Sequence, residues 1–393
     1  MSELRGMAWD HPRGVAPLLA ASEVFAERYG TEVRWDARPL RGFEEQSVAE
    51  LAARYDVIAI DHPFMGSAFA EGALLPLDSL LPDAFTAELR SASVGPSWES
   101  YRWEGSSWAV PVDAAAQVAA YRQDLLREAG AAVPATWAEV QALADGAGRG
   151  LVALPANGTH LLLALATVCH GLARGGGTGA DLAPAWWGED GIDPEVGEPA
   201  LEILLRLLAK AHPMSLESDP IQVFERMTRT DEISYVPVAF GYSTYARADQ
   251  VPRPAVFTAV PSPDGRLRGG MLGGVGLAVS RRLADPERLV PFLELVAGAA
   301  FQSGPYAACG GQPAHRAAWT SPEVNDGCPG FFAPTLDALD VSFVRPRAAW
   351  YPRFQREGGE VLHEAVRAGA GPTAALAALR RCQQSVREAY SPS

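Results

Sequence analysis

Two copies of the tripeptide Asp-His-Pro have the clearest chemical potential in this sequence. One begins at Asp10 in GMAWDHPRG and the other at Asp61 in IAIDHPFMG, and each directly follows a short apolar run. The chain has only seven histidines, so matched settings for His11 and His62 suggest a shared role. An imidazole beside a carboxylate can coordinate a metal ion, exchange protons or hydrogen-bond a ligand.

These roles place different demands on the backbone. Consecutive residues of a strand point to opposite faces, so Asp10 and His11 reach one metal ion only if the chain turns there, as Pro12 permits. Acid–base catalysis suits histidine because its ordinary pKa lies near neutral pH. The rings of His11 and His62 could instead hydrogen-bond a ligand or fix the loops by packing. Because the strand geometry opposes a shared ion, we expect no metal site.

Other reactive residues give weaker signals. Cys309 in ACGGQPAH is the one candidate nucleophile, with His315 nearby as a base, and a small buried thiol is the competing interpretation. The glycines over 269–276 lack both the GxGxxG and the Walker spacing, so no nucleotide and no other cofactor is expected. The four cysteines form no CxxC pair, which argues against structural zinc, while a disulfide between Cys309 and Cys328 stays open.

Composition and charge limit the classes of molecule that the protein can bind. A net charge of −14 argues against nucleic acid and anionic membranes, because both require basic patches. A chain of 393 residues with 48% hydrophobic residues suits two globular lobes. The longest apolar run, 160–173, is too short to cross a bilayer, and the first residues lack a secretory signal. As written, the protein is expected in the cytoplasm; a removed signal would place it in the periplasm or on a membrane tether.

The elements around the two motifs follow a strand–helix–strand–helix–strand pattern. Apolar periodicity predicts these five elements, in order, over 4–9, 17–30, 31–35, 48–55 and 56–61. The pattern is typical of a doubly wound sheet, whose ligands bind beyond the carboxyl ends of the strands. If the strand order is 2-1-3, the tips of the first and third strands lie about 5 Å apart. Both tripeptides would then face one crevice.

The rest of the chain continues in mixed α/β fashion. A strand leads to Pro111, and Thr136 with Glu139 forms a capping box for a helix. The apolar stretch 149–157 is predicted to be a strand that ends at Asn157. Further predictions are a helix, a strand, a strand followed by a helix, and a helical tail, over 198–212, 231–247, 268–298 and 357–390.

Several segments resemble the family 1 extracellular solute-binding proteins, the sugar-type binding proteins of ABC importers. The strongest is WAVPVDAAAQVAAYRQDLLREAGAAVPATWAEVQALAD, and YDVIAIDHPFMGSAFAEGALLPLD, GGMLGGVGLAVSRRLADPERLVPFLELV, CGGQPAHRAAW and VRPRAAWYPRF follow the same family order. The resemblance implies an α/β, two-lobe, periplasmic-binding-protein-like fold of type II, each lobe built on a doubly wound mixed sheet. The N-terminal lobe would comprise 1–111 and 264–315, and the C-terminal lobe 112–263 and 316–393.

The resemblance also implies a ligand cleft between the lobes, closed by a hinge. Residues expected to contact the ligand come from both lobes and their crossovers: Trp9, Asp10, His11, Asp61, His62, Asp113, Asn157, Tyr242, Gly273 and Gly274. Aspartates that cap a helix, an Asn157-Gly158 turn and glycines that only let the backbone approach closely are the structural alternatives. One ring of Trp186 and Trp187 could cover the ligand, and Arg345 and Arg347 could pair within the protein or reach an acidic ligand.

The implied function is capture of a small polar ligand, sugar-like or a small organic acid. The protein would act as a monomer that serves an ABC transporter permease. The alternative is a cytoplasmic enzyme on the same fold, with His11 and His62 as acid–base residues and Cys309 as a further catalytic candidate. Whether the protein turns over its ligand is left open by the sequence.

Overall fold

The chain forms two compact units in a computed structural model that describes residues 2–39, 47–146, 151–173, 184 and 186–390. Unit 1 consists of Met1–Ala115, Gly273–Gly327 and Arg345–Pro352, and unit 2 of Ala116–Leu272, Cys328–Val344 and Arg353–Ser393. The lobe boundaries expected near residues 111, 263 and 315 stay predictions. The inclusion of 345–352 in unit 1 has no counterpart in the sequence pattern, and it matters for the site described below.

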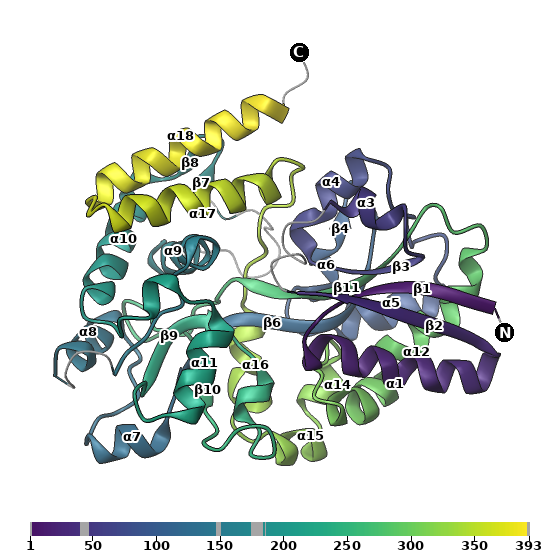
Figure 1. The fold of residues 1–393 in the computed structure, drawn as a ribbon, viewed down its shortest axis with the longest axis horizontal. Helices are drawn as coiled ribbons and strands as arrows, with labels where there is room; N and C mark the ends of the chain where they lie inside the picture. Colours follow the sequence, from purple (N-terminus) through teal and green to yellow (C-terminus); the bar gives the residue numbers. More distant parts are fainter. Residues whose placement is uncertain (1, 40–46, 147–150, 174–183, 185, 391–393) are drawn as a thin grey trace. The chain divides into compact units, whose positions relative to one another are not determined.

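Unit 1 contains a parallel three-stranded core (Figure 1), and an Asp-His-Pro motif directly follows two of its strands. Strand β1 (Ser2–Trp9) pairs in parallel with β2 (Thr31–Arg38) on one side and with β3 (Val57–Ile60) on the other. The order of these three strands is therefore 2-1-3, the arrangement under which the sequence places the two strand tips side by side. Every residue of β3 is buried, which explains its unbroken apolar sequence. On its other side, β3 pairs antiparallel with β11 (Leu272–Val279).

Helix α1 (Pro12–Tyr29) follows β1 and packs its apolar side on unit 1. It begins at the proline after His11 and ends at Gly30, whose φ of 64° is the left-handed conformation that glycine adopts without strain. Phe25 on α1 meets Phe292 edge-on at 5.4 Å. The other helices and turns of the unit are α3 (Val48–Ala52), η1 (His62–Phe64), α4 (Met65–Ala70), α5 (Asp83–Ala92), α6 (Ser97–Ser100), η4 (Pro286–Leu289), α12 (Val290–Ala297), α13 (Ala299–Phe301), η5 (Gln302–Tyr306), α14 (Arg316–Trp319) and α15 (Pro322–Gly327).

Unit 2 is built on the second half of the long strand β6 (Val110–Tyr121), which begins in unit 1. Strands β9 (Tyr235–Phe240) and β10 (Val256–Thr258) both pair antiparallel with it. Two short hairpins complete the strands: β4 (Arg102–Trp103) with β5 (Ser106–Ser107) in unit 1, and β7 (Trp187–Gly188) with β8 (Gly191–Ile192) in unit 2. Unit 1 thus combines parallel and antiparallel strand pairs, as a mixed sheet predicts, whereas β9 and β10 of unit 2 pair with β6 in antiparallel fashion only.

The helices of unit 2 include the longest apolar run of the chain, 160–173. They are α7 (Gln123–Glu128), α8 (Trp137–Gly146), α9 (Gly158–Leu172), α10 (Pro194–Leu208), η2 (Ser215–Glu217), α11 (Pro220–Arg229), η3 (Ser243–Ala246), α16 (Phe332–Asp340), α17 (Tyr351–Arg367, which begins in unit 1) and α18 (Pro372–Tyr390). Helix α9 is buried along most of its length. No helix in the described ranges is both long and apolar enough to span a membrane.

Of two local predictions for unit 2, the capping box is confirmed and the strand before Asn157 is wrong. The capping box is confirmed: Thr136 N–H donates to Glu139 at 2.9 Å, and Glu139 N–H donates to the Thr136 hydroxyl at 3.2 Å. The strand predicted to end at Asn157 is wrong, because the described part of that stretch makes only an isolated bridge between Val152 and Tyr235. Pro155 offers no N–H for a ladder, and Asn157 instead caps α9. A short apolar run alone does not distinguish a strand from buried irregular chain.

Candidate functional site

The tip of β1 presents one exposed carboxylate beside a stacked pair of rings. Trp9 ends the strand, and the imidazole of His11 stacks on its indole with ring centroids 4.5 Å apart and planes inclined by 9°. Asp10 between them is exposed, and within the described chain no hydrogen bond or ion pair holds its carboxylate. Its backbone N–H donates to the Arg38 carbonyl on β2 at 2.7 Å. The tip is therefore ordered while the Asp10 carboxylate stays available.

His11 also serves as the N-cap of α1. Its Nδ1 accepts the backbone N–H of Arg13 at 3.2 Å, a position that Ser, Thr, Asp or Asn usually fills. Burial, and then the nearby Arg13 charge, lowers the pKa of His11 to about 4. His11 is therefore a neutral ring at physiological pH.

Asp113 lies at the unit 1 end of β6 and is buried in an ion pair. The Arg13 guanidinium binds its carboxylate with two hydrogen bonds, Nε to Oδ2 at 2.7 Å and Nη2 to Oδ1 at 2.5 Å, and both side chains are less than 5% exposed. Burial raises the pKa of Asp113, and Arg13 opposes that rise. The carboxylate that the sequence assigned to the ligand is thus already bound inside the protein.

The tip of β3 is held by a cation from a distant part of the chain. Asp61 caps η1 by accepting the His62 N–H at 2.8 Å, and Arg345 Nη2 lies 2.5 Å from its other oxygen. The His62 ring is completely buried, and its Nε2 accepts the backbone N–H of Arg345 at 3.3 Å. Although burial alone would raise the pKa of Asp61, Arg345 and His62 bring it down to about 2. Burial and Arg345 lower the pKa of His62 to about 4.

These environments bear on the catalytic and metal alternatives. An acid–base histidine titrates near neutral pH, whereas both His11 and His62 have a pKa of about 4. Cys309 is exposed, but both ring nitrogens of His315 are engaged elsewhere: Nδ1 accepts the Ala317 N–H at 3.1 Å, and Nε2 lies 3.3 Å from Glu88. Among the residues that the structure describes, no three His, Cys, Asp or Glu side chains form a metal-binding group.

The cysteines and the glycines take structural positions. All four cysteines are free thiols, so Cys309 and Cys328 form no disulfide. Gly273 is buried in β11, and Gly274 has a φ of 131°, where a Cβ would come within 2.3 Å of the Asp113 carbonyl oxygen. Gly274 therefore allows β11 to pass close to β6, which is the structural alternative weighed for this stretch.

The candidates in unit 2 are all close to other side chains. Asn157 caps α9, and its Oδ1 lies 2.8 Å from His160 Nδ1. Tyr242 is 5% exposed and packs against Phe224 and Tyr245. Trp186 and Trp187 are buried too, at 4% and 8% exposure. Their burial in the unit supports a packing role over that of a loop ring that covers ligand.

Arg13 and Arg345 form buried ion pairs in unit 1 that the sequence did not predict. Arg13 follows the first tripeptide directly, but nothing in its spacing pointed to Asp113. Arg345 was weighed as an internal partner without Asp61 being named, since 284 positions separate them. Arg347 also holds the segment 345–352 against the rest of unit 1. Its Nη1 donates to the Glu99 carbonyl at 2.9 Å, and its own carbonyl accepts the Gly66 N–H at 2.9 Å. The half-buried Trp350 lies on the same segment, three residues beyond Arg347.

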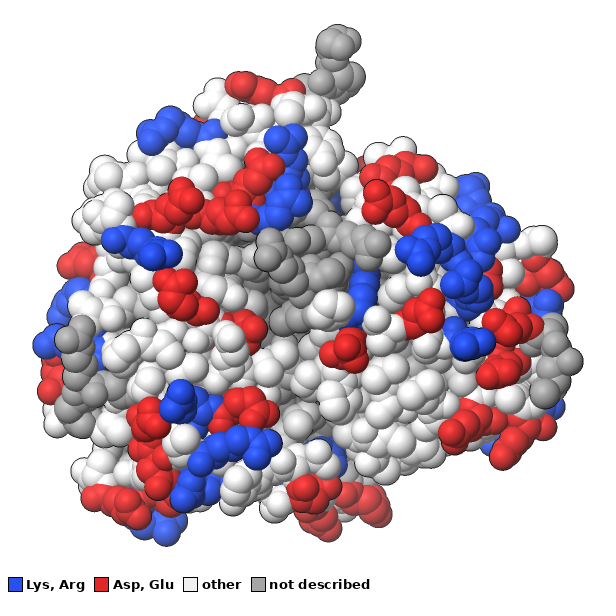
Figure 2. All heavy atoms as spheres, in the orientation of Figure 1, with Lys and Arg blue, Asp and Glu red and all other residues white. Residues whose placement is uncertain are grey.

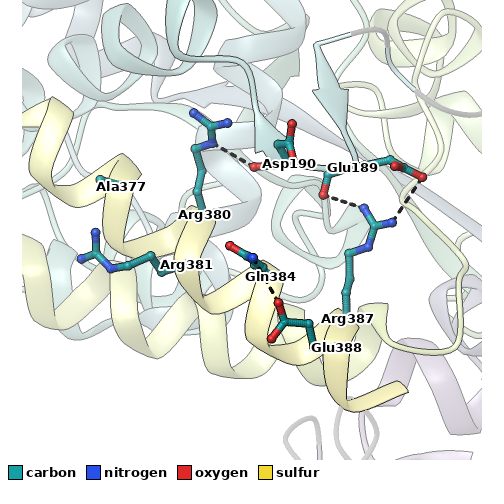
Figure 3. Close-up of a pocket in the computed structure, with 8 residues that line it drawn as sticks. All are labelled: Glu189, Asp190, Ala377, Arg380, Arg381, Gln384, Arg387 and Glu388. Carbon is teal, nitrogen blue, oxygen red and sulfur yellow. Dashed lines mark hydrogen bonds and ion pairs between the residues drawn. The ribbon is translucent and has the colours of Figure 1, made fainter. Parts of the chain in front are cut away.

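A separate pocket of about 530 Å³ lies in unit 2 between α18 and the β7–β8 turn (Figure 3). Arg380 donates to the Asp190 carbonyl at 2.8 Å and Arg387 to the Glu189 carbonyl at 2.5 Å, so these arginines fasten the turn to the helix. Three arginines and three carboxylates line the pocket, along with Ala377 and Gln384. The balanced charges fit a structural contact, and none of the predicted site residues is present there. Acidic and basic side chains are also interspersed over the face in Figure 2.

Comparison with known proteins gives a consistent result. A sequence model of the family described as "Bacterial extracellular solute-binding protein" matches residues 9–302. No curated protein sequence matches the chain. Among solved structures, the Agrobacterium radiobacter K84 solute-binding protein in complex with ribitol is 19% identical with a TM-score of 0.78, covering 99% of each chain. Maltose-bound T. maritima MalE3 is 19% identical with a TM-score of 0.79, covering 98% of this chain and 100% of that one.

The structural likeness extends over nearly the full length of both chains, so it confirms the predicted type II, two-lobe fold class. The sequence match extends over most of the chain and includes the β1 tip, both Asp-His-Pro motifs, β6 and β11. It includes three of the five segments that carry the resemblance, while CGGQPAHRAAW and VRPRAAWYPRF lie beyond residue 302. The chain belongs to the bacterial extracellular solute-binding protein family.

Proposed function

We propose that this protein captures a small neutral polyhydroxylated solute, a sugar or a polyol, and delivers it to an ABC-type importer. The observation that carries the proposal is the β1 tip, where the available Asp10 carboxylate adjoins the stacked rings of Trp9 and His11. Carboxylates accept hydrogen bonds from sugar hydroxyls. Trp9 is 5% exposed and supports the partly buried His11 ring from behind. Relatives of the same fold, described as complexes with ribitol and D-mannitol and as maltose-bound, support this ligand class.

The charges of unit 1 favour a neutral solute over the organic acid that the sequence left open. Arg13 is paired with Asp113, and Arg345 is paired with Asp61. An acidic ligand would have to compete with these internal carboxylates for either guanidinium. Asp10 adds a negative charge at the tip, which repels an anion and accepts hydrogen bonds from hydroxyl groups.

The remaining parts of the proposal follow from the family. The solute would lie in the cleft between the lobes, with Tyr242 and Asn157 contributing from unit 2, and the lobes would close over it by a hinge. The protein would act as a monomer outside the cytoplasmic membrane, either periplasmic or membrane-tethered, and dock on the permease when closed. The description of the family as extracellular supports this location.

A ligand screen tests the proposal. Thermal-shift measurements against neutral sugars, polyols and small organic acids should find a stabilising neutral solute, and calorimetry should then show saturable binding. A solute at a hundred times its Kd stabilises the folded state by about 2.7 kcal/mol. Stabilisation by acids but not by polyols would contradict the neutral-solute assignment, and no hit across the whole panel would contradict the binding function.

A further inference from the structure

A groove beside α8 in unit 2 is lined by residues other than those proposed to contact the solute. This α8 groove lies between the connection from α7 to α8 and one side of α8, and its volume is about 610 Å³. Small-molecule sites have volumes of about 300–1000 Å³. The described residues that line it are apolar or glycine except for one carboxylate, and they are 129–134, Glu139, Ala142, Leu143, Gly146 and Leu151. Such a lining suits a ligand that is mostly hydrocarbon and has one polar end.

Hydrogen bonds to the main chain hold the lining of the α8 groove in place. The Leu151 carbonyl accepts the backbone N–H of Tyr235 at 3.2 Å, which joins Leu151 to the start of β9. The hydroxyl of Tyr235, a fully buried residue, donates to the Pro134 carbonyl at 3.2 Å in the α7–α8 connection. The carbonyl of Ala135, the next residue along, accepts the Ser262 N–H at 3.0 Å. The α8 groove is therefore a fixed part of the fold.

Apolar groups at the α8 groove lie at the surface instead of in the core. Val133 is 39% exposed, Ala142 and Gly146 are exposed, and Leu143 is partly exposed. With Glu139 at one end, the lining residues of α8 have the spacing i, i+3, i+4 and i+7, which places them along one face of the helix. A hydrocarbon chain along this face would remove apolar surface from water, which favours binding.

Glu139 supplies the charge at the end of this face. Its Oε2 accepts the backbone N–H groups of Ala135 at 2.8 Å and Thr136 at 2.9 Å, and these bonds lower the pKa of Glu139. The carboxylate is therefore ionised at neutral pH. No Lys, Arg or His side chain of the described residues forms an ion pair with Glu139, which is exposed. A carboxylate has about four acceptor sites, so capacity remains for a donor from a ligand.

We propose that the α8 groove is a second binding site and takes an amphiphilic primary amine, with the hydrocarbon chain along the α8 face and the ammonium group on Glu139. An ammonium group has three N–H donors and the charge complementary to the carboxylate. An alcohol with the same chain donates one neutral hydrogen bond, and a carboxylate is repelled. The net charge of −14 adds to the attraction of a cation. The inference goes beyond the proposed function, since it concerns other residues and another class of ligand.

Titration of the full chain with butyl-, hexyl- and octylammonium tests the site. Amide resonances should show saturable binding, with the largest shifts at 129–134 and 139–146. Affinity should rise about two- to fourfold with each added methylene, because the chain is partly buried in the groove. Hexanol should bind more weakly than hexylammonium, and hexanoate most weakly of the three. No saturable binding of octylammonium below about 5 mM, or shifts centred elsewhere, overturns the inference.

Two variants with matched controls separate the charge from the apolar face. Glu139→Gln keeps a side chain that suits the capping box, so the protein should fold while hexylammonium binds about three- to fivefold more weakly and hexanol is unaffected. Asp145→Asn removes a carboxylate of the same helix that pairs with Lys210 at 3.4 Å, and should change affinity by less than about twofold. Ala142→Trp fills the groove and should abolish binding, whereas Ala138→Trp adds the same ring at an exposed position outside the lining and should not.

The outcomes distinguish the amine from other occupants. Unchanged hexylammonium affinity in Glu139→Gln removes the role of the charge, and unchanged octylammonium affinity in folded Ala142→Trp shows that the groove is not the site; either result overturns the inference. Self-association of the unaltered protein, measured by light scattering and abolished in Ala142→Trp, would assign the groove to a second copy of the chain instead. Failure of the amine titration leaves the solute screen unaffected, and failure of the solute screen leaves the amine site standing.

Discussion

The two Asp-His-Pro segments have the same sequence and opposite environments. At the β1 tip, Asp10 is exposed and His11 caps a long helix beside Trp9. At the β3 tip, His62 is completely buried and Asp61 is paired with Arg345. A buried cation is the difference: Arg345 draws its carboxylate inward, whereas Arg13 is already matched by Asp113. The tripeptide ends a strand in both places, and the nearest arginine decides whether its aspartate faces solvent or the core.

Removal of the Arg345 charge should have the largest effect. In Arg345→Met the Asp61 carboxylate loses its cation in a largely buried site, so the free energy of unfolding should fall by about 3–5 kcal/mol. Urea denaturation followed by tryptophan fluorescence measures the loss. Arg5→Met is the matched control, because the Arg5–Asp36 pair is about half exposed on both sides and such pairs contribute about 1 kcal/mol or less. Equal losses in the two variants would remove the proposed distinction between the tips.

The second largest effect should come from His62 and should appear in the pH dependence of the free energy of unfolding. The pKa of His62 is about 4 in the folded protein and 6.5 ordinarily, so the folded state binds fewer protons between these values. Its contribution is full above pH 6.5 and declines as the pH falls toward 4, by about 3 kcal/mol in total. His62→Gln should flatten this decline in the free energy of unfolding measured from pH 7 to 4. The Asp61 contribution, with a pKa of about 2, should be lost only below its ordinary 3.8. An unchanged acid slope in His62→Gln would contradict the buried neutral ring.

The glycine that follows each motif, Gly14 or Gly66, allows the two tips to be compared by the same substitution. In Gly66→Ala the new Cβ would lie 2.1 Å from the Arg347 carbonyl oxygen, a backbone atom fixed by its own hydrogen bond, so we expect a loss of about 2 kcal/mol. In Gly14→Ala the closest approach is 2.9 Å, and the better helix propensity of alanine returns about 1 kcal/mol. Thermal melts of both variants measure the difference. A larger loss of stability from Gly14→Ala than from Gly66→Ala would contradict the tighter packing expected at the β3 tip.

The smallest effect on stability should come from Asp10. Asp10→Ala removes no ion pair seen in the described chain, so the melting temperature should stay within about 2 °C. Solute affinity should fall about tenfold or more, since a hydrogen bond to a charged group is worth about 1.5–3 kcal/mol. Calorimetry on a solute found in the screen measures this. If stability falls and affinity does not, Asp10 is a structural residue and the two tips are alike.

The sequence predicted the features that depend on neighbouring residues. Apolar periodicity predicted β1, α1 and β3, and the Thr136–Glu139 spacing predicted a helix start. These succeed because each signal lies within a few residues of the structure it specifies. The resemblance to solute-binding proteins added the fold class.

Features that depend on distant residues were not predicted. The partners of Asp113 and Asp61 lie 100 and 284 positions away, and a single sequence gives no sign of such pairs. The segment before Asn157 was mistaken for a strand because burial in a core, rather than sheet pairing, accounts for its apolar residues. The role of Gly274 required the position of β6, which no local pattern contains.

The residues at 345–352 also affect how the chain acquires its structure during synthesis. Unit 1 includes a segment that the ribosome makes after most of unit 2, and Asp61 has no cation until Arg345 emerges. Until then the N-terminal part of the chain has an unpaired carboxylate in an apolar setting and a surface around Gly66 that is still uncovered. Completion of unit 1 therefore waits until residues 345–352 have been synthesised. A fragment that ends before residue 345 should lack a stable β3 tip, however complete its strands.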